Sequence, residues 1–235
     1  MTQVNGQVDL SVVIPALNAA ATLPATLASL APFADRGLRI EVLVVDGGST
    51  DDTVLTAERC GARVLTSARG RGRQLAAGAE AVAGRFLLFL HADTCLEADA
   101  LRAVPAFIAD PNAGHWAGYF RFRLDDRAPA ARRLERWVAR RCRWCALPYG
   151  DQGLLLSRSL YRAVGGFQPL PLMEDVDLVR RLGRTRLVPL AGTAVTSADR
   201  FLRAGYLRRS LRNLTCLTLH LLGVPADRIA RFYGS

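Results

Sequence analysis

The chain has 235 residues, half of them hydrophobic, which is enough to fill the core of one large domain or two small ones. It carries 31 basic and 21 acidic residues, and the resulting net charge of +10 suits phosphorylated substrates, polyanions or anionic membrane surfaces. The basic residues are spread along the chain without a basic tract or a nucleic-acid motif, so we expect no nucleic-acid partner.

The first part of the chain alternates short apolar runs with helical stretches. The runs predict strands over residues 10–14, 40–45, 62–65 and 86–90. Helices are expected over residues 18–30, with Asn18 as N-cap, over residues 51–59, and up to residue 83 after a basic loop at 69–74. This alternation is typical of right-handed crossovers and a mostly parallel sheet, whose carboxyl edge binds ligands.

The pattern loosens after Asp93. Helices are expected over residues 97–108, 130–143, 173–182 and 201–222, and strands over residues 115–124 and 154–157. The five cysteines and the lack of an export leader predict reduced thiols in the cytoplasm. No apolar stretch reaches the ~20 residues that a membrane-spanning helix needs.

Acidic residues stand at predicted strand ends or helix starts, at Asp46, Asp93 and the Glu174-Asp175 pair. Taken singly, each is most simply a turn former or a helix cap. Taken together at the ligand-binding edge of a parallel sheet, they indicate a functional site.

The stretches SVVIPALNAAATLPATLASL, VVDGGSTDDT, FLLFLHADT and MEDVDLVRRL resemble family-2 glycosyltransferases of the GT-A fold, and the resemblance runs from Leu10 to about Gly223. The patterns HADT, PYGDQGLLLSR, GGF and PLMEDVDLVRRL are similar to a small bacterial subgroup. Its members are labelled radical-SAM/selenodomain-associated or arsenosugar-pathway glycosyltransferases.

The resemblance implies an α/β, Rossmann-like mixed sheet, mostly parallel and flanked by helices, in a single GT-A domain over residues 1–235. Residues 8–95 would form the nucleotide-sugar-binding half and residues 96–200 the acceptor half, followed by amphipathic helices over 201–235. The implied reaction moves a sugar from a nucleotide-diphosphate sugar to a hydroxyl of an unidentified acceptor, with inversion.

Donor binding is implied for a set of residues at the ends of the first strands and in the basic loop. These are Pro15, Ala16, Asn18, Asp46, Arg71, Arg73, Ala92 and Asp93. Asp46 would accept a hydrogen bond from the base, and the arginines would meet the diphosphate at a helix N-terminus. The alternative for the arginines is a solvated basic loop. Ala19 stands where the family usually has an acidic residue, so one usual polar contact is missing or supplied elsewhere.

A divalent cation, Mn²⁺ or Mg²⁺, is also implied, because Asp93 matches the last aspartate of the family's DxD motif. A hard cation on the diphosphate would stabilise the leaving group. His91 replaces the first aspartate, and as a metal ligand it suits Mn²⁺ better than Mg²⁺. The alternative is that His91 contacts the ribose or packs.

Asp175 matches the family's general base, which takes the proton of the attacking hydroxyl. Glu174 would orient the acceptor or Asp175, and Asp151 and Gln152 would face the donor sugar or the acceptor. Local signal alone favours a charged helix start for Glu174 and Asp175, and for Asp151 and Gln152 it fits a turn equally well.

Two other functions stay open on the sequence. A nucleotidyltransferase usually carries a basic residue in the loop after the first strand, whereas PALNAAAT is uncharged here. A non-catalytic sugar-nucleotide-binding or membrane-docked protein would hydrolyse no nucleotide sugar. The amphipathic stretch over 201–222 fits a membrane surface, a covered sheet or a homodimer contact.

Overall fold

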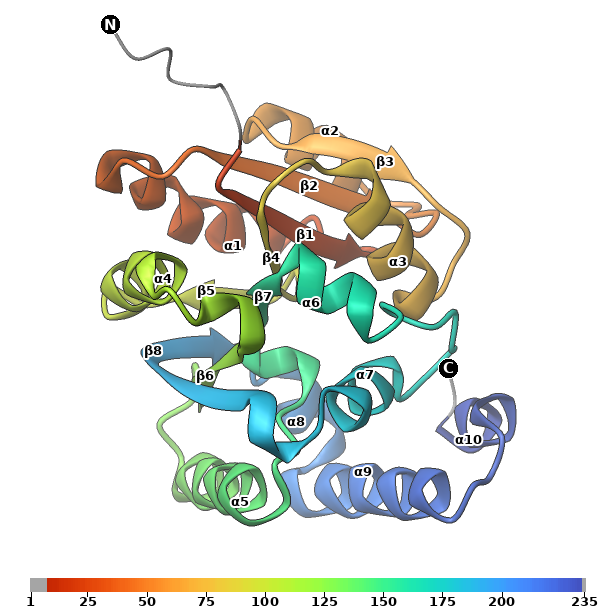
Figure 1. Cartoon of the computed structure of the whole chain (residues 1–235). Coiled ribbons are helices and arrows are strands. Elements are labelled where there is room, and N and C mark those ends of the chain that lie inside the picture. The colour runs from red at the N-terminus through yellow and green to blue at the C-terminus, as the bar shows by residue number, and fades with distance from the viewer. Residues whose placement is uncertain (1–7, 234–235) are drawn as a thin grey trace, which may run out of the picture.

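A computed structural model describes residues 8–233 and contains an eight-stranded sheet in the order β3-β2-β1-β4-β7-β6-β8-β5 (Figure 1). The strands are β1 (Leu10–Ala16), β2 (Ile40–Asp46), β3 (Arg63–Thr66), β4 (Phe86–Phe89), β5 (Thr94–Leu96), β6 (Ala117–Leu124), β7 (Leu154–Ser157) and β8 (Leu187–Thr196). The helices are α1 (Leu23–Leu30), α2 (Thr53–Arg59), α3 (Arg71–Ala81), α4 (Ala100–Ala109), α5 (Pro129–Cys145), α6 (Arg158–Ala163), α7 (Glu174–Leu182), α8 (Asp199–Ala204), α9 (Tyr206–Leu221) and α10 (Ala226–Tyr233).

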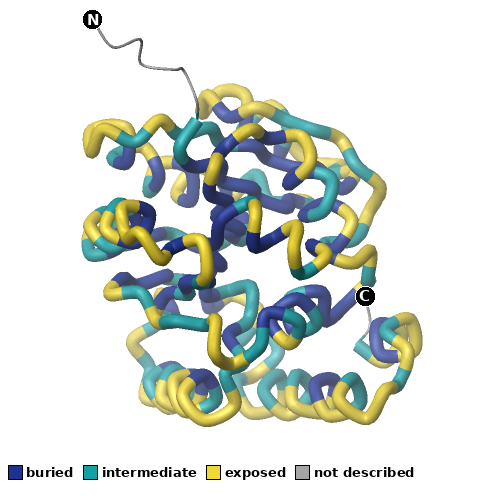
Figure 2. The backbone as a smooth tube through the Cα atoms, viewed as in Figure 1, coloured by how far each residue is buried: buried dark blue, intermediate teal, exposed yellow. Residues whose placement is uncertain are grey.

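The first four strands form a parallel block, as the alternating sequence predicts. Strand β1 pairs in parallel with both β2 and β4, and β2 pairs in parallel with β3. Successive side chains of a strand point to opposite faces, so Val12 and Ile14 enter the core beneath α1 while Val13 enters the core beneath α3. Both faces of the central strands β1 and β4 are therefore buried, which explains their apolar runs (Figure 2).

The second part of the sheet is mixed. Strand β7 is antiparallel to β4 and β6, β6 is parallel to β8, and β5 is antiparallel to β8. The expected α/β architecture with a mixed, mostly parallel sheet is confirmed. The sequence did not predict β5, α6 or β8; the stretch of β8, LVPLAGTAVT, shows no period-2 alternation of apolar and polar residues.

Three differences between the observed and the predicted element boundaries concern the candidate site or the C-terminal helices. Helix α1 begins at Leu23 with Thr22 at its N-cap position, so Asn18 is not its N-cap and lies instead in the preceding turn with a left-handed φ of 50°. Helix α3 begins at Arg71, so the predicted basic loop is shorter than expected. The expected helix over 201–222 is broken at Gly205, whose φ is 80°, into α8 and α9.

Candidate active site

Asp46 ends β2 and is almost fully buried. Its Oδ1 accepts from the Ser49 hydroxyl at 2.5 Å, and its Oδ2 accepts from the backbone N–H groups of Gly48 at 3.0 Å and Ser49 at 3.1 Å. The Gln74 side-chain amide, from α3, donates to the carbonyls of Ala16 and Val45 at 2.8 and 2.7 Å. The carboxyl ends of β1 and β2 are thus tied together, and the Asp46 carboxylate holds the turn that follows.

Pro15 and Ala16 lie in β1 itself, not in the loop that the sequence suggested. Strand β4 pairs with β1 only as far as Val13, so Pro15 is tolerated beyond that point, where β1 has no neighbour on this side. Asn18 is exposed, and its Oδ1 accepts from the Thr50 N–H at 2.8 Å. The first loop therefore packs against the loop after β2.

The end of β4 delivers His91, Ala92 and Asp93 to the same edge. Ala92 is buried, and its carbonyl accepts from the Thr26 hydroxyl of α1 at 3.1 Å. Asp93 keeps a side chain that is 19% exposed, and its Oδ2 lies 4.0 Å from the Arg200 guanidinium of α8. Asp93 is therefore a weakly paired carboxylate beside the sheet edge.

Gly150 lies in space between His91, which follows β4, and Asp175, at the start of α7. A Cβ placed on Gly150 would lie 2.6 Å from His91 Nε2 and 3.5 Å from Asp175 Oδ2. The Gly150 N–H donates to Asp175 Oδ2 at 2.8 Å, and the Val176 N–H donates to Asp175 Oδ1 at 2.8 Å. His91 and Asp175, far apart in sequence, therefore both lie close to Gly150, where a side chain would collide with the imidazole.

Glu174 is fully buried at the start of α7, and its Oε1 lies 2.7 Å from the Arg71 Nε of α3. Apart from this ion pair, neither carboxylate oxygen has a hydrogen-bond partner among the described residues. Burial raises the pKa of Glu174, Arg71 opposes the rise, and Asp175 adds to it. The Glu174 carboxylate in turn raises the pKa of the Arg71 guanidinium, whereas Arg73 is exposed. The two predicted phosphate-binding arginines thus face different surroundings.

Asp151 lies in the short 3₁₀ turn Gly150–Gln152, and its buried Oδ1 has no hydrogen-bond partner in the described part of the chain. Burial raises its pKa to about 6; the carboxylates of Asp175 and Asp93 add to the rise, and Arg141 and Arg71 oppose it. Asp151 therefore sits in the acidic cluster with a free acceptor atom.

Gln152 is nearly fully buried, and its side chain makes hydrogen bonds within the protein. Its Nε2 donates to the Phe120 carbonyl at 3.0 Å, and its Oε1 accepts from Arg141, at 3.2 Å, and from the Cys142 thiol, at 3.1 Å. The contact between Gln152 and a sugar therefore stays a prediction, since both polar atoms of the buried side chain already bond to the protein.

A pocket opens beside this cluster. It is lined by Leu75, Phe89, Leu90, His91, Pro148, Tyr149, Gly150, Gly153, Leu154, Phe167, Glu174, Asp175 and Val179. The Arg141 guanidinium lies 3.4 Å from the centre of the Tyr149 ring, which fixes that ring at the rim. The sequence analysis did not single out Tyr149, Arg141 or Arg200; the phrase PYG before Asp151 was the signal for Tyr149, whereas no local pattern marks the arginines.

The metal chemistry of the site depends on few protein ligands. No group of three or more His, Cys, Asp or Glu side chains within residues 8–233 is placed to hold a metal ion. Burial lowers the pKa of His91 well below its usual value, and Arg71 and Arg200 lower it further, so the imidazole is neutral and keeps a lone pair. One carboxylate and one imidazole fit a cation that takes its remaining ligands from a diphosphate.

The chain is similar in sequence to known glycosyltransferases. Residues 11–169 match the model of the Glycosyl transferase family 2. A glucosyl-3-phosphoglycerate synthase of Mycobacterium tuberculosis is 38% identical over 93 residues, covering 36% of this chain and 28% of that protein. A PGL/p-HBAD biosynthesis glycosyltransferase of Mycobacterium bovis is 40% identical over 108 residues, covering 43% of this chain and 41% of that protein. The chain thus spans less than half the length of these two relatives.

Solved structures share the fold. Glucosyl-3-phosphoglycerate synthase from M. tuberculosis, solved with Mn²⁺ and UDP-glucose, gives a TM-score of 0.59 at 24% identity, covering 92% of this chain and 80% of that one. TarS residues 1–349 of S. aureus, solved with UDP-GlcNAc, gives a TM-score of 0.59 at 19% identity, covering 80% of this chain and 58% of that one. These similarities confirm the expected GT-A fold.

Proposed function

The chain belongs to glycosyl transferase family 2, and we propose that it transfers a sugar from a nucleotide-diphosphate sugar to an acceptor hydroxyl with inversion. The observation that carries this proposal is the position of the Asp175 carboxylate, which is held at Gly150 beside His91 at the end of β4. A base at this point lies where a parallel sheet presents its ligand.

Asp175 is the proposed general base. Each of its oxygens accepts one backbone hydrogen bond, from Gly150 or from Val176, so the carboxylate is fixed while further lone pairs stay available. It would take the proton of the acceptor hydroxyl as that oxygen bonds to the anomeric carbon. The bond to the diphosphate breaks on the opposite face, and the nucleoside diphosphate leaves with the electron pair, so one base suffices for inversion.

Asp93 and His91 are the proposed protein ligands of a divalent cation, Mn²⁺ or Mg²⁺. When bound, the cation would neutralise charge on the departing diphosphate. The exposed edge of Asp93 and the neutral imidazole of His91 support this assignment, and the Arg200 guanidinium near Asp93 adds positive charge on the same side.

The donor is proposed to be a uridine nucleotide sugar, because two structural neighbours were solved with UDP-glucose and UDP-GlcNAc. Asn18 and the turn after Asp46 would flank the base. The Asp46 oxygens already accept from Gly48 and Ser49, so base recognition through Asp46 requires the Ser49 hydroxyl to rotate away. Arg73 is exposed and free to meet phosphate, whereas Arg71 would have to share its guanidinium with Glu174.

Asp151 is the proposed contact for a sugar or acceptor hydroxyl, because its Oδ1 is buried without a hydrogen-bond donor among the described residues. A substrate hydroxyl would supply that donor. The motifs HADT, PYGDQGLLLSR, GGF and PLMEDVDLVRRL further support placing the chain in the radical-SAM/selenodomain-associated subgroup. That placement leaves the acceptor open.

The test separates donor binding from transfer. UDP-glucose, UDP-GlcNAc, GDP- and dTDP-sugars are screened by thermal shift with and without Mn²⁺, since a ligand of the native state raises the melting temperature. With the best donor, Asp175→Asn should keep the shift and lower transfer or donor hydrolysis about 10²–10⁴-fold, the usual contribution of a general base.

Asp177→Asn, two residues along the same helix, is the matched control and should keep turnover, since Asp177 is paired with Arg181 away from Asp175. Asp93→Ala should abolish the manganese-dependent part of the shift. Near-normal turnover of Asp175→Asn would refute the base assignment. Release of pyrophosphate from a nucleoside triphosphate would instead identify a nucleotidyltransferase.

A further inference from the structure

The net charge of the protein is concentrated in four helices. Helices α5, α8, α9 and α10 carry thirteen arginines and three acidic residues, a surplus of ten that equals the +10 of the whole chain. The remainder of the sequence is electrically balanced. Nine of the thirteen arginines are exposed: Arg133, Arg136, Arg140, Arg143, Arg200, Arg203, Arg208, Arg228 and Arg231. An average over the whole sequence hides this asymmetry.

The exposed apolar side chains gather on the same helices. Ten large apolar residues of the described chain are exposed, and nine of them lie on these four helices or directly after α9. They are Trp137, Trp144, Leu202, Leu207, Leu211, Leu214, Leu221, Leu222 and Phe232. Leu207, Leu211 and Leu214 follow the spacing of one helix face, and Leu207 is 74% exposed. Such clustering marks an interaction surface.

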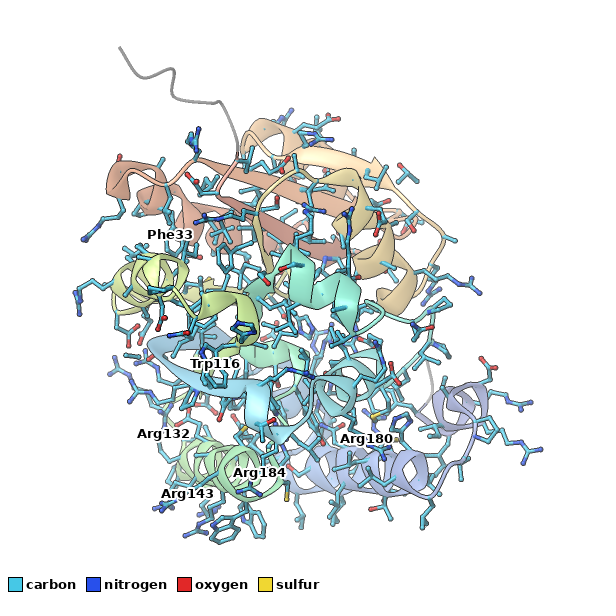
Figure 3. The ribbon with its side chains drawn as sticks, in the orientation of Figure 1. Phe33, Trp116, Arg132, Arg143, Arg180 and Arg184 are labelled. Carbon is cyan, nitrogen blue, oxygen red and sulfur yellow. The ribbon has the colours of Figure 1, made fainter. Side chains whose placement is uncertain are left out.

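These helices form one edge of the molecule. Helix α9 packs against α5, α8 and α10, and α5, α9 and α10 run along the lower edge in Figure 1. Their inner sides are buried through Val138 and Cys142 of α5, and through Cys216 and Leu217 of α9. In Figure 3 the Arg143 side chain lies below α5, away from the sheet. The outer sides of α5, α8, α9 and α10 are defined here as the basal face.

We propose that the basal face docks on an anionic lipid bilayer. Arginine, tryptophan and leucine together suit the boundary between headgroups and acyl chains, because leucine and indole enter the apolar layer while guanidinium groups stay at the phosphates. The charge decides between a bilayer and a second copy of the chain. Two basal faces brought together would repel each other because both carry surplus positive charge, whereas an anionic bilayer neutralises that charge.

The mode of attachment is peripheral. Within the described residues no helix is long and apolar enough to cross a bilayer. Helix α8 belongs to the basal face and carries Arg200, which lies 4.0 Å from Asp93. A bilayer on this face would therefore lie beside one border of the candidate active site. The docking itself does not depend on the proposed reaction.

Vesicle flotation of the full chain tests the proposal. The protein should float with vesicles of phosphatidylcholine mixed with phosphatidylglycerol, and not with vesicles of phosphatidylcholine alone. Raising the salt to about 1 M, where the screening length falls to about 3 Å, should weaken the binding. Arg136→Glu with Arg140→Glu should reduce partitioning about 25-fold or more, at about fivefold for each arginine removed.

Leu207→Glu with Leu211→Glu tests the apolar contribution and should also lose flotation. The matched control is Leu55→Glu with Arg59→Glu on α2, where both residues are exposed at a distance from the basal face; it should float like the wild type. Circular dichroism confirms that each variant is folded.

Equal flotation of the wild type and both basal-face variants would overturn the proposal, and so would a failure of the wild type to bind the anionic vesicles. A stable dimer by light scattering that the leucine variant converts to a monomer would assign the face to a second copy instead. Loss of glycosyl transfer in a variant that still floats would concern the proposed function alone.

Discussion

The carboxylate at the end of β2 and the carboxylates around Gly150 differ in how fully their oxygens are hydrogen-bonded within the protein. Asp46 is buried, yet its oxygens accept from Gly48 and Ser49 in the turn that it closes. Glu174 is equally buried but has only the ion pair with Arg71, and Asp151 has a buried oxygen without a donor among the described residues. Burial alone therefore does not distinguish a structural carboxylate from one with capacity left for a ligand.

The difference has an energetic meaning. A carboxylate that is buried with its hydrogen bonds made stabilises the fold, whereas one that lacks them costs stability and keeps its capacity to bind or to exchange a proton. Groups of the second kind with shifted pKa values gather at functional sites. The Gly150 region has this character, and four substitutions test how it differs from Asp46.

The largest effect is expected at Glu174. Although Glu174 lacks hydrogen bonds, it neutralises Arg71: Glu174→Ala would leave the Arg71 guanidinium, whose side chain is 34% exposed, without its partner, and the free energy of unfolding should fall by about 3 kcal/mol. Urea denaturation of the single variants and of the Arg71→Ala/Glu174→Ala double variant measures the coupling. The double variant should recover part of the loss; additive losses would show that the ion pair contributes nothing.

Asp46→Ala should come next. It removes the acceptor of two backbone N–H groups and a hydroxyl, so the free energy of unfolding should fall by about 2–3 kcal/mol. Asp52→Ala is the matched control, because Asp52 is exposed and its side chain caps nothing; it should cost less than about 0.5 kcal/mol. Equal losses of unfolding free energy in the two variants would show that the Asp46 hydrogen bonds do not stabilise the fold.

Gly150→Ala tests the junction itself. The new methyl group would sit 2.6 Å from His91 Nε2, and the displacement should cost about 1–3 kcal/mol of stability. Transfer should fall more than donor binding, because Asp175 loses its fixed position. Gly114→Ala has open space for a methyl group and serves as the control. Wild-type turnover of Gly150→Ala would contradict the tight contact at this junction.

Asp151→Asn should change stability in the opposite direction. The folded-state pKa of about 6 lies above the ordinary 3.8, so above pH 6 the ionised Asp151 destabilises the native state. At pH 7.5 the variant should gain about 1–2 kcal/mol, less than the full shift would give because Asp151 is partly exposed. As the pH falls from 6 toward 4 the wild type becomes protonated, and the gain should vanish.

Thermal unfolding at a series of pH values measures this gain. If Asp151 contacts a substrate hydroxyl, as proposed, the same variant should raise the KM for donor or acceptor. A gain that does not depend on pH would rule out the ionised carboxylate as its cause.

The parallel block and the order of its carboxylates could be predicted from the amino-acid sequence alone. The short apolar runs that end at Asp46 and His91 are typical of buried strands that bring polar residues to one edge of a sheet. The resemblance added the GT-A fold, which the structural neighbours confirm. The start of α1, the break at Gly205 and strand β8 were missed, because left-handed φ values and sheet partners are not encoded in hydrophobic periodicity.

The surroundings of the charged residues became visible only in the folded chain. The Arg71–Glu174 pair, the contact of His91 with Gly150 and the pKa of Asp151 join segments that lie far apart in sequence. Such interactions depend on distance and burial, which vary steeply in space and leave no local pattern. The same holds for the basal face. Its charge can be counted from the sequence, but the packing of α5 against α9 brings that charge to one side of the molecule.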